Sequence, residues 1–97
     1  MNANLLVISA AIAEAEALRF TPAGIPALNL ILEHESEVLE TGAKRQVKAV
    51  LKAMAFGALA ERLVKQSIGS RWKFQGFLAN ARHGKSVVLH IQEFSQI

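Results

Sequence analysis

Two prolines flank a glycine between residues 21 and 26, and this segment limits most strongly what the chain can fold into. The run reads Thr-Pro-Ala-Gly-Ile-Pro and lies between two apolar stretches. Proline has no backbone N–H and a fixed φ, so neither Pro22 nor Pro26 allows a helix to continue, and Gly24 gives the freedom that a tight turn needs. We therefore expect a chain reversal at residues 21–26.

The chain after this reversal has the pattern of a strand. Leu28, Leu30 and Leu32 alternate with other residues, a period of two that places the three leucines on one face. We expect a half-buried strand ending near His34, and then an exposed, charged connection over 35–46 with its turn at Thr41-Gly42. Before the reversal the local preference is divided, because residues 5–8 favour a strand and residues 10–19 favour a helix.

Residues 44–56 fit helical and strand periodicity equally well, so the pattern alone does not decide between them. Lys44, Lys48 and Lys52 are four residues apart and share one side in either case. A short helix is expected from residue 58, with Gly69 as its stop.

Two further strands are expected at residues 70–80 and 86–94, joined by a hairpin loop at 81–85. Alternation divides the side chains of each strand between two faces. In the first strand, one face has Trp72, Phe74, Gly76 and Leu78, and the other has Arg71, Lys73, Gln75 and Phe77. In the second strand, one face has Val87, Leu89, Ile91 and Glu93, and the other has Val88, His90, Gln92 and Phe94.

The length and composition indicate one soluble globular domain over residues 1–97. A chain of 97 residues can build only one modest core, and 52% of its residues are hydrophobic. No stretch approaches the ~20 uninterrupted apolar residues that a bilayer crossing needs, so we expect no membrane partner. The first residues lack the basic start of a signal peptide, and the absence of cysteine is compatible with a reducing, cytoplasmic location.

Charge is divided unevenly along the chain, whose net charge is +3. Six of the eight acidic residues precede Gly42, and ten of the eleven Lys and Arg residues follow it. This asymmetry indicates a basic face and an anionic partner, most often nucleic acid, although a mildly basic small protein is more often simply soluble.

If residues 44–56 form a strand, the order of elements is βββαββ, which is that of a five-stranded OB-fold barrel, all-β with one short helix. Four segments carry a more specific resemblance: "AGIPALNLILEHES", "RQVK", "GSRWKFQGFL" and "VVLHIQEF". In order and spacing they resemble the primosomal replication protein N (PriB) family, within the superfamily of single-stranded-DNA-binding proteins. The chain also stops at Ile97, close to its last expected strand, whereas the general single-stranded-DNA-binding proteins continue into an acidic tail.

The resemblance implies a non-enzymatic homodimer that binds single-stranded DNA, the restart helicase and other primosome proteins, and that stimulates unwinding in replication restart. It implies no cofactor. Carried over by position, the family's DNA-binding surface corresponds to Arg19, Lys44, Arg45, Lys48, Arg82 and Lys85.

This chain departs from the family pattern at three places. Lys48 stands where a better-known relative has an aromatic residue that stacks on a base, and Glu35 stands where a basic residue is expected. The loop at 81–85 is shorter and has fewer lysines. We therefore expect weaker and more electrostatic DNA binding, since one lost stacking contact costs ~1–3 kcal/mol.

Other polar and aromatic residues have simpler explanations. Trp72 alternates with core residues and is better explained by packing than by base stacking, while Phe77 fits a stacking platform or a dimer interface equally well. His34, His83 and His90 have no metal-ligand spacing, so no metal site is expected. The acidic run Glu33, Glu35, Glu37 and Glu40 lacks a nucleophile or base beside it, so no catalytic site is expected.

Two other hypotheses remain open at this stage. The lysines and the acidic connection suit a protein-interaction adaptor on the same fold, for which DNA contact is weak or incidental. A small helical regulator is the third possibility, because several stretches are helix-prone.

Overall fold

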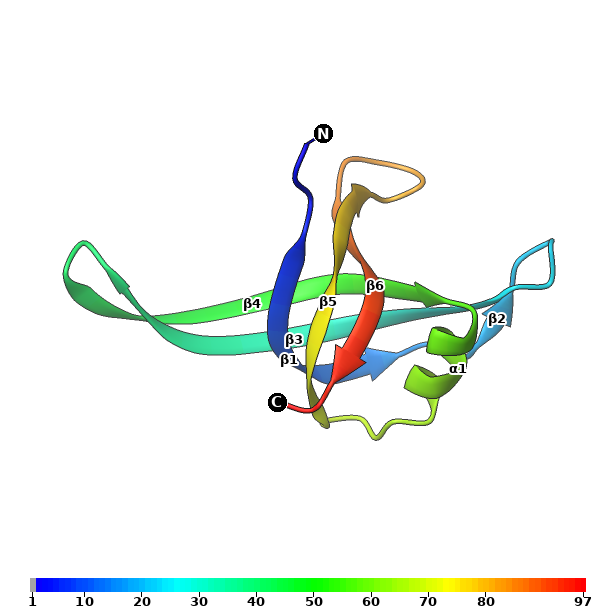
Figure 1. The fold of residues 1–97 in the computed structure, drawn as a ribbon, viewed down its shortest axis with the longest axis horizontal. Helices are drawn as coiled ribbons and strands as arrows, with labels where there is room; N and C mark the ends of the chain where they lie inside the picture. The colour runs from blue at the N-terminus through cyan, green and yellow to red at the C-terminus, as the bar shows by residue number, and fades with distance from the viewer. Residues whose placement is uncertain (1) are drawn as a thin grey trace.

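A computed structural model describes residues 2–97 of the chain (Figure 1). Five long strands and one short helix make up the fold, and a further strand of two residues precedes the second long one. In chain order the elements are β1 (Leu6–Ala15), β2 (Arg19–Phe20), β3 (Pro26–Glu40), β4 (Ala43–Phe56), α1 (Ala58–Val64), β5 (Arg71–Asn80) and β6 (Val87–Ser95). Residues 43–56 are therefore a strand, and the expected βββαββ order of long elements is confirmed.

The sheet closes into a barrel because β1 has a strand partner on each side. Residues Leu6 to Ala11 pair with β5, and from Ala11 onward β1 pairs with β3. A register shift between Ile12 and Glu14 accompanies this change of partner, as is usual where a barrel strand bends. Parallel pairing of β4 with β6 completes the ring.

The expected reversal at residues 21–26 is confirmed. The Thr21 N–H donates to the carbonyl of Ile25 (2.9 Å), and the Gly24 N–H donates to the carbonyl of Thr21 (2.8 Å). The Thr21 hydroxyl oxygen accepts a third bond from the Ile25 N–H (3.1 Å). These bonds join β2 to β3 as a tight hairpin, in which Arg19 pairs with Ala27.

The expected strand end at His34 is wrong. β3 and β4 stay paired in one register from Ala27 with Phe56 to Glu40 with Ala43, so the predicted charged connection is a two-stranded ribbon. We call residues 33–50 of this hairpin the arm; it projects from one side of the barrel (Figure 1). The predicted turn is confirmed: Thr41 (φ 51°) and Gly42 (φ 81°) form a two-residue hairpin loop with positive φ at both positions.

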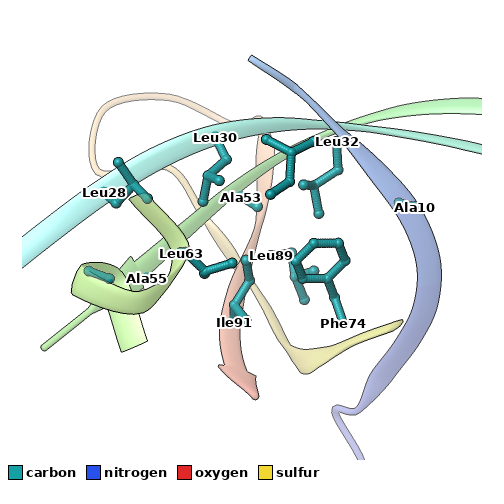
Figure 2. Packing of buried hydrophobic residues seen from close by; sticks show 12 residues of the cluster. Ala10, Leu28, Leu30, Leu32, Ala53, Ala55, Leu63, Phe74, Leu89 and Ile91 are labelled. Atoms are coloured by element: carbon teal, nitrogen blue, oxygen red, sulfur yellow. The ribbon is translucent and has the colours of Figure 1, made fainter. Parts of the chain in front are cut away.

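The core lies inside the barrel, where one face of β3 meets β5 and β6. Leu28, Leu30 and Leu32 are buried on one face of β3, as their alternation predicts. Leu28 lies beside α1, and Leu30 and Leu32 lie toward Leu89 of β6 and Phe74 of β5 (Figure 2). α1 adds the buried Ala60 and Leu63 to the core. The helix ends at Val64, earlier than the expected stop at Gly69.

The expected faces of β5 and β6 are correct in the middle of each strand and wrong near the ends. Gly76 pairs with Ile91 and Gln75 pairs with Glu93, so Gln92 is an extra residue in β6. This bulge reverses the alternation and brings Phe94 to the core side, opposite Phe74.

Two other side chains depart from the alternation at the opposite ends of β5 and β6. Leu78, expected on the core face with Phe74, is 36% exposed. Val87, expected on the face of Leu89 and Ile91, is 47% exposed, while Val88 is buried. Both lie near the loop that joins the strands.

Trp72 takes the packing role that its position predicts. Its ring is half-buried and meets Phe94 edge-on, with the ring centroids 5.2 Å apart. Its indole N–H donates to the Ser70 hydroxyl (2.9 Å). The indole nitrogen thus has a hydrogen-bond partner nearby, and the rest of the ring packs against the edge of the core.

Candidate nucleic-acid interface

The outer face of β4 carries a row of lysines along its length. Lys44, Lys48 and Lys52 point away from the core, and all three are exposed. Because a strand rises ~3.3 Å per residue, successive lysines stand ~13 Å apart. We call these three residues the lysine row; it runs from the tip of the arm to the barrel.

Glutamates on β3 accompany the lysine row where it crosses the arm. Lys48 Nζ lies 3.6 Å from the Glu35 carboxylate, and Lys44 Nζ lies 3.9 Å from that of Glu37. The residues pair across the ribbon, Glu35 directly opposite Lys48. Exposed ion pairs are worth at most ~1 kcal/mol, so a phosphate can compete for these lysines, but the carboxylates lower the positive potential.

Arg45 lies on the opposite face of the arm from the lysine row, because it is adjacent to Lys44 in the strand. Its guanidinium donates to Glu40 Oε1 at 2.8 Å. The structure therefore separates Arg45 from the other arm cations that the sequence grouped with it.

A groove of about 920 Å³ lies where the lysine row reaches the barrel. Its walls come from the β2 hairpin, the outer faces of β3 and β4, and the start of the loop between β5 and β6. Figure 1 shows β2 and this loop as the two projections near that end of the barrel. Three cations line it, from three segments far apart in sequence: Arg19, Lys52 and Arg82.

A chain of polar contacts fixes one wall of the groove. The Asn29 side-chain N–H donates to Glu16 Oε2 (3.0 Å), and Arg19 donates to Asn29 Oδ1 at 3.5 Å. The side-chain amide of Asn29 is thus oriented, with its donor toward a carboxylate and its acceptor toward a guanidinium. Glu14 also lines the groove.

Aromatic rings lie at the other wall. His90 is stacked between two phenylalanines, with ring centroids 4.8 Å from Phe77 and 6.2 Å from Phe56. Phe56 and His90 line the groove, and so does Phe20, which is 64% exposed. Flat apolar rings beside cations are the features with which proteins hold unpaired bases and their phosphates.

Sequence reasoning missed Phe20, Phe56 and His90 as site residues and, of these rings, considered Phe77 alone as a stacking platform. Phe56 is four residues beyond Lys52, so the spacing that relates the lysines also places it on their face once β4 is known to be a strand. His90 pairs with Met54 of β4 and with Phe77 of β5, a long-range register that no local pattern reveals.

Comparison with known proteins gives the family. A model described as "Another single-strand binding protein family" matches residues 4–93. The replication restart protein PriB of Bordetella pertussis is 46% identical over 95 residues, which cover 97% of this chain and 89% of that protein. The chain belongs to the PriB family. A solved structure of PriB from Ralstonia solanacearum superposes with a TM-score of 0.88 at 33% identity, covering 98% of each chain.

More distant structures support the fold alone. A small single-stranded DNA-binding protein from Streptomyces coelicolor gives a TM-score of 0.77 at 16% identity, covering 100% of this chain and 95% of that one. The OB-fold expectation is confirmed by these superpositions and by the closed barrel.

The residues that the PriB resemblance implied as DNA-binding fall into four places. Lys44 and Lys48 lie in the lysine row, Arg19 and Arg82 line the groove, and Arg45 lies on the other face of the arm. Lys85 is exposed in the loop and is not among the residues that line the groove. The lysine row and the groove form one continuous surface, which we call the candidate interface.

Across 2–97, no three His, Asp or Glu side chains are grouped so that they could hold a metal ion. Within the same residues, no helix is long and apolar enough to span a bilayer.

Proposed function

We propose that this protein binds single-stranded DNA as a non-enzymatic accessory of replication restart. The observation that carries the proposal is the candidate interface, in which the lysine row leads into a groove lined by Arg19, Arg82 and Phe56. Cations at ~13 Å intervals suit a phosphate backbone, and exposed rings suit its bases. Family membership gives the cellular process, since relatives are named replication restart proteins.

The test is a salt series of fluorescence-anisotropy titrations with a labelled oligothymidylate. Each phosphate contact to a single strand changes the slope of log K against log salt by about 0.7. Wild type is compared with Lys48→Ala/Lys52→Ala and with Arg82→Ala. The matched control is Lys65→Ala, an exposed lysine just beyond α1 and outside the candidate interface.

We expect the double variant to flatten the slope by about 1.4 and Arg82→Ala by about 0.7, with the control unchanged. Equal slopes for all four proteins would mean that DNA does not bind at the candidate interface. The absence of salt-dependent binding by wild type would overturn the DNA-binding role itself.

We further propose that the protein works in the cytoplasm beside the restart helicase and other primosome proteins, as the PriB resemblance implies. Pull-down of the helicase by the tagged protein, followed by unwinding assays with and without it, tests binding and stimulation separately. If adding the protein leaves the rate of unwinding by the helicase unchanged, the proposed stimulatory role is wrong.

A homodimer is the assembly we propose. Within residues 2–97, the segment from Leu6 to Ala10 of β1 has a strand partner on one side only. Its other edge is therefore available to a second copy except at Ser9, whose carbonyl accepts a bond from His34 Nδ1 (2.6 Å). Two apolar side chains beside this edge are exposed, Leu5 at 64% and Val7 at 49%. Sedimentation equilibrium of wild type and Val7→Lys tests this edge; a monomeric wild type, or a dimer unaffected by the substitution, would rule it out.

A protein-interaction adaptor is the second candidate function, and the paired charges of the arm favour it. Glu35 and Glu37 alternate in space with Lys48 and Lys44, a mixed pattern that suits a protein surface better than a uniform polyanion. Helicase binding by wild type together with negligible DNA binding would favour the adaptor.

A further inference from the structure

The groove contains groups that a phosphate-binding channel does not need. Glu14 and Glu16 line it together with Arg19, Lys52 and Arg82. A carboxylate repels a passing phosphate, so the part of the strand next to these side chains must carry hydrogen-bond donors instead. In single-stranded DNA the donors are on the bases.

We propose that the groove holds one unpaired base, stacked on Phe56, and that Glu16 makes this site prefer guanine to thymine. The proposal rests on the proposed single-stranded-DNA binding and adds a base preference to it. It concerns one position on the bound strand; the lysine row contacts the remainder through phosphates.

The stacking surface is held in place from behind. Phe56 is 41% exposed, and His90, stacked between Phe77 and Phe56, supports one side of its ring. The rings of Phe56 and His90 are inclined by 27°. A base stacking on Phe56 uses the opposite face of the ring and meets an immobilised partner, which keeps the entropy cost of binding low.

The strand register places the carboxylate beside this platform. Glu16 donates its N–H to the carbonyl of Asn29 (3.0 Å), Asn29 pairs with Met54, and Met54 pairs with His90. These four residues form one row across the floor of the groove. Glu16 is two strand spacings from Met54, and Phe56 is two residues further along β4, so the backbones of Glu16 and Phe56 are roughly 12 Å apart. A purine together with the two side chains fills this distance.

The carboxylate of Glu16 is oriented by one hydrogen bond and has spare acceptor capacity. Its Oε2 accepts the bond from Asn29, whose own position is set by Arg19. An ionised carboxylate offers about four lone-pair sites, so a ligand can still be bound. Its relative rigidity makes it suitable for reading a base edge.

Among the four bases, guanine matches a carboxylate best. Its N1–H and N2–H₂ are adjacent donors on the Watson–Crick edge, and two parallel charge-assisted bonds to one carboxylate are possible. Adenine and cytosine present one amino group beside a ring-nitrogen acceptor. Thymine presents N3–H between two carbonyl oxygens, both of which the carboxylate repels.

The experiment compares oligonucleotides that differ at one base. Anisotropy titrations use a labelled dT 12-mer and the same 12-mer with a single central dG, which cannot form a quadruplex within one strand. A third probe carries deoxyinosine at that position, which keeps N1–H and lacks the 2-amino group. The proteins are wild type, Glu16→Gln and the matched control Glu61→Gln, which removes an equal charge from exposed α1.

We expect wild type and Glu61→Gln to bind the dG oligonucleotide about fivefold more tightly than dT, with deoxyinosine between them. Glu16→Gln is expected to bind dT at least as well as wild type and to bind dG less than twofold better than dT. Phe56→Leu, which keeps an apolar side chain and removes the ring, should weaken the binding of all three oligonucleotides by the same factor.

Each contrary result has a definite meaning. Salt-dependent binding of dT by wild type with no preference for dG would overturn the base preference and leave the proposed function intact. A preference that survives in Glu16→Gln would overturn the role of Glu16. Failure of wild type to bind any of the probes would overturn the base site together with the proposed function.

Discussion

Replacing Glu35 with glutamine should strengthen binding to single-stranded DNA. Glu35 Oε1 lies 3.6 Å from Lys48 Nζ, and the two side chains are 67% and 79% exposed. A phosphate bound to Lys48 would therefore lie ~7 Å from the carboxylate, where two like charges in water repel by ~0.6 kcal/mol. Glutamine keeps the size and the strand pairing and removes this repulsion.

The size of the effect follows from two contributions. Removing ~0.6 kcal/mol of repulsion tightens Kd by about threefold. The freed Lys48 no longer has to give up an exposed ion pair worth ~0.2–1 kcal/mol when it contacts a phosphate, which raises the expected gain to roughly 4- to 15-fold. The gain should shrink with salt, because the screening length falls to ~8 Å at 0.15 M.

The assay is anisotropy with a labelled dT oligonucleotide at low and at physiological salt. The control is Glu40→Gln, which removes the same charge from the same strand on the opposite face, beside Arg45. Glu35→Gln should bind more tightly and the control should not. If both variants tighten binding equally, net charge alone is responsible, and the assignment of DNA to the outer face of β4 is refuted.

Four other substitutions test the fold and the proposed DNA-binding face of β4. Gly76→Ala should destabilise by about 3 kcal/mol or more, because a Cβ there would overlap the backbone carbonyl of His90; urea unfolding measures this, and an unchanged midpoint would contradict the packing. Phe74→Ala, at a residue that is 0% exposed, should cost ~3–5 kcal/mol in the same assay, and a loss below ~1 kcal/mol would mean that the core is mislocated. Lys52→Ala should weaken DNA binding and Arg45→Ala should not, and a reversed order in titrations would assign DNA to the other face of the arm.

Local sequence signals were sufficient for the turns and for the core face of β3. The prolines and Gly24 marked the reversal, and the Thr41-Gly42 turn was correctly located. Alternation found Leu28, Leu30 and Leu32 because one side of β3 is buried and the other is not. These features depend on neighbours in the chain, so a single sequence contains them.

The arm was missed because both of its faces are in contact with water. Its residues are mostly charged and small, a composition that is typical of loops, and a ribbon without a buried face has no apolar alternation. The arm is recognised only from the pairing of β3 with β4. The bulge at Gln92 was missed for a related reason, since an inserted residue reverses the alternation without leaving a local signal.

The candidate site was predictable in part. Spacing alone found the lysine row, because residues four apart share a side in a strand. The groove was not predictable, because it joins the β2 hairpin, the end of β4 and the residues after β5 through long-range pairing. The aromatic wall depends on the parallel pairing of Met54 with His90, which only the closed barrel supplies.

The arm has a consequence for solubility. Along much of the ribbon, the outer edges of β3 and β4 have no strand partner among residues 2–97, so their free N–H and C=O groups could template association with other chains. Charged side chains at short intervals oppose such edge-to-edge stacking, because each copy would have to desolvate Glu35, Glu37 and their lysine partners. The glutamates that we expect to weaken DNA binding should thus also protect the ribbon from aggregation, and a variant without them should bind DNA more tightly and aggregate more readily.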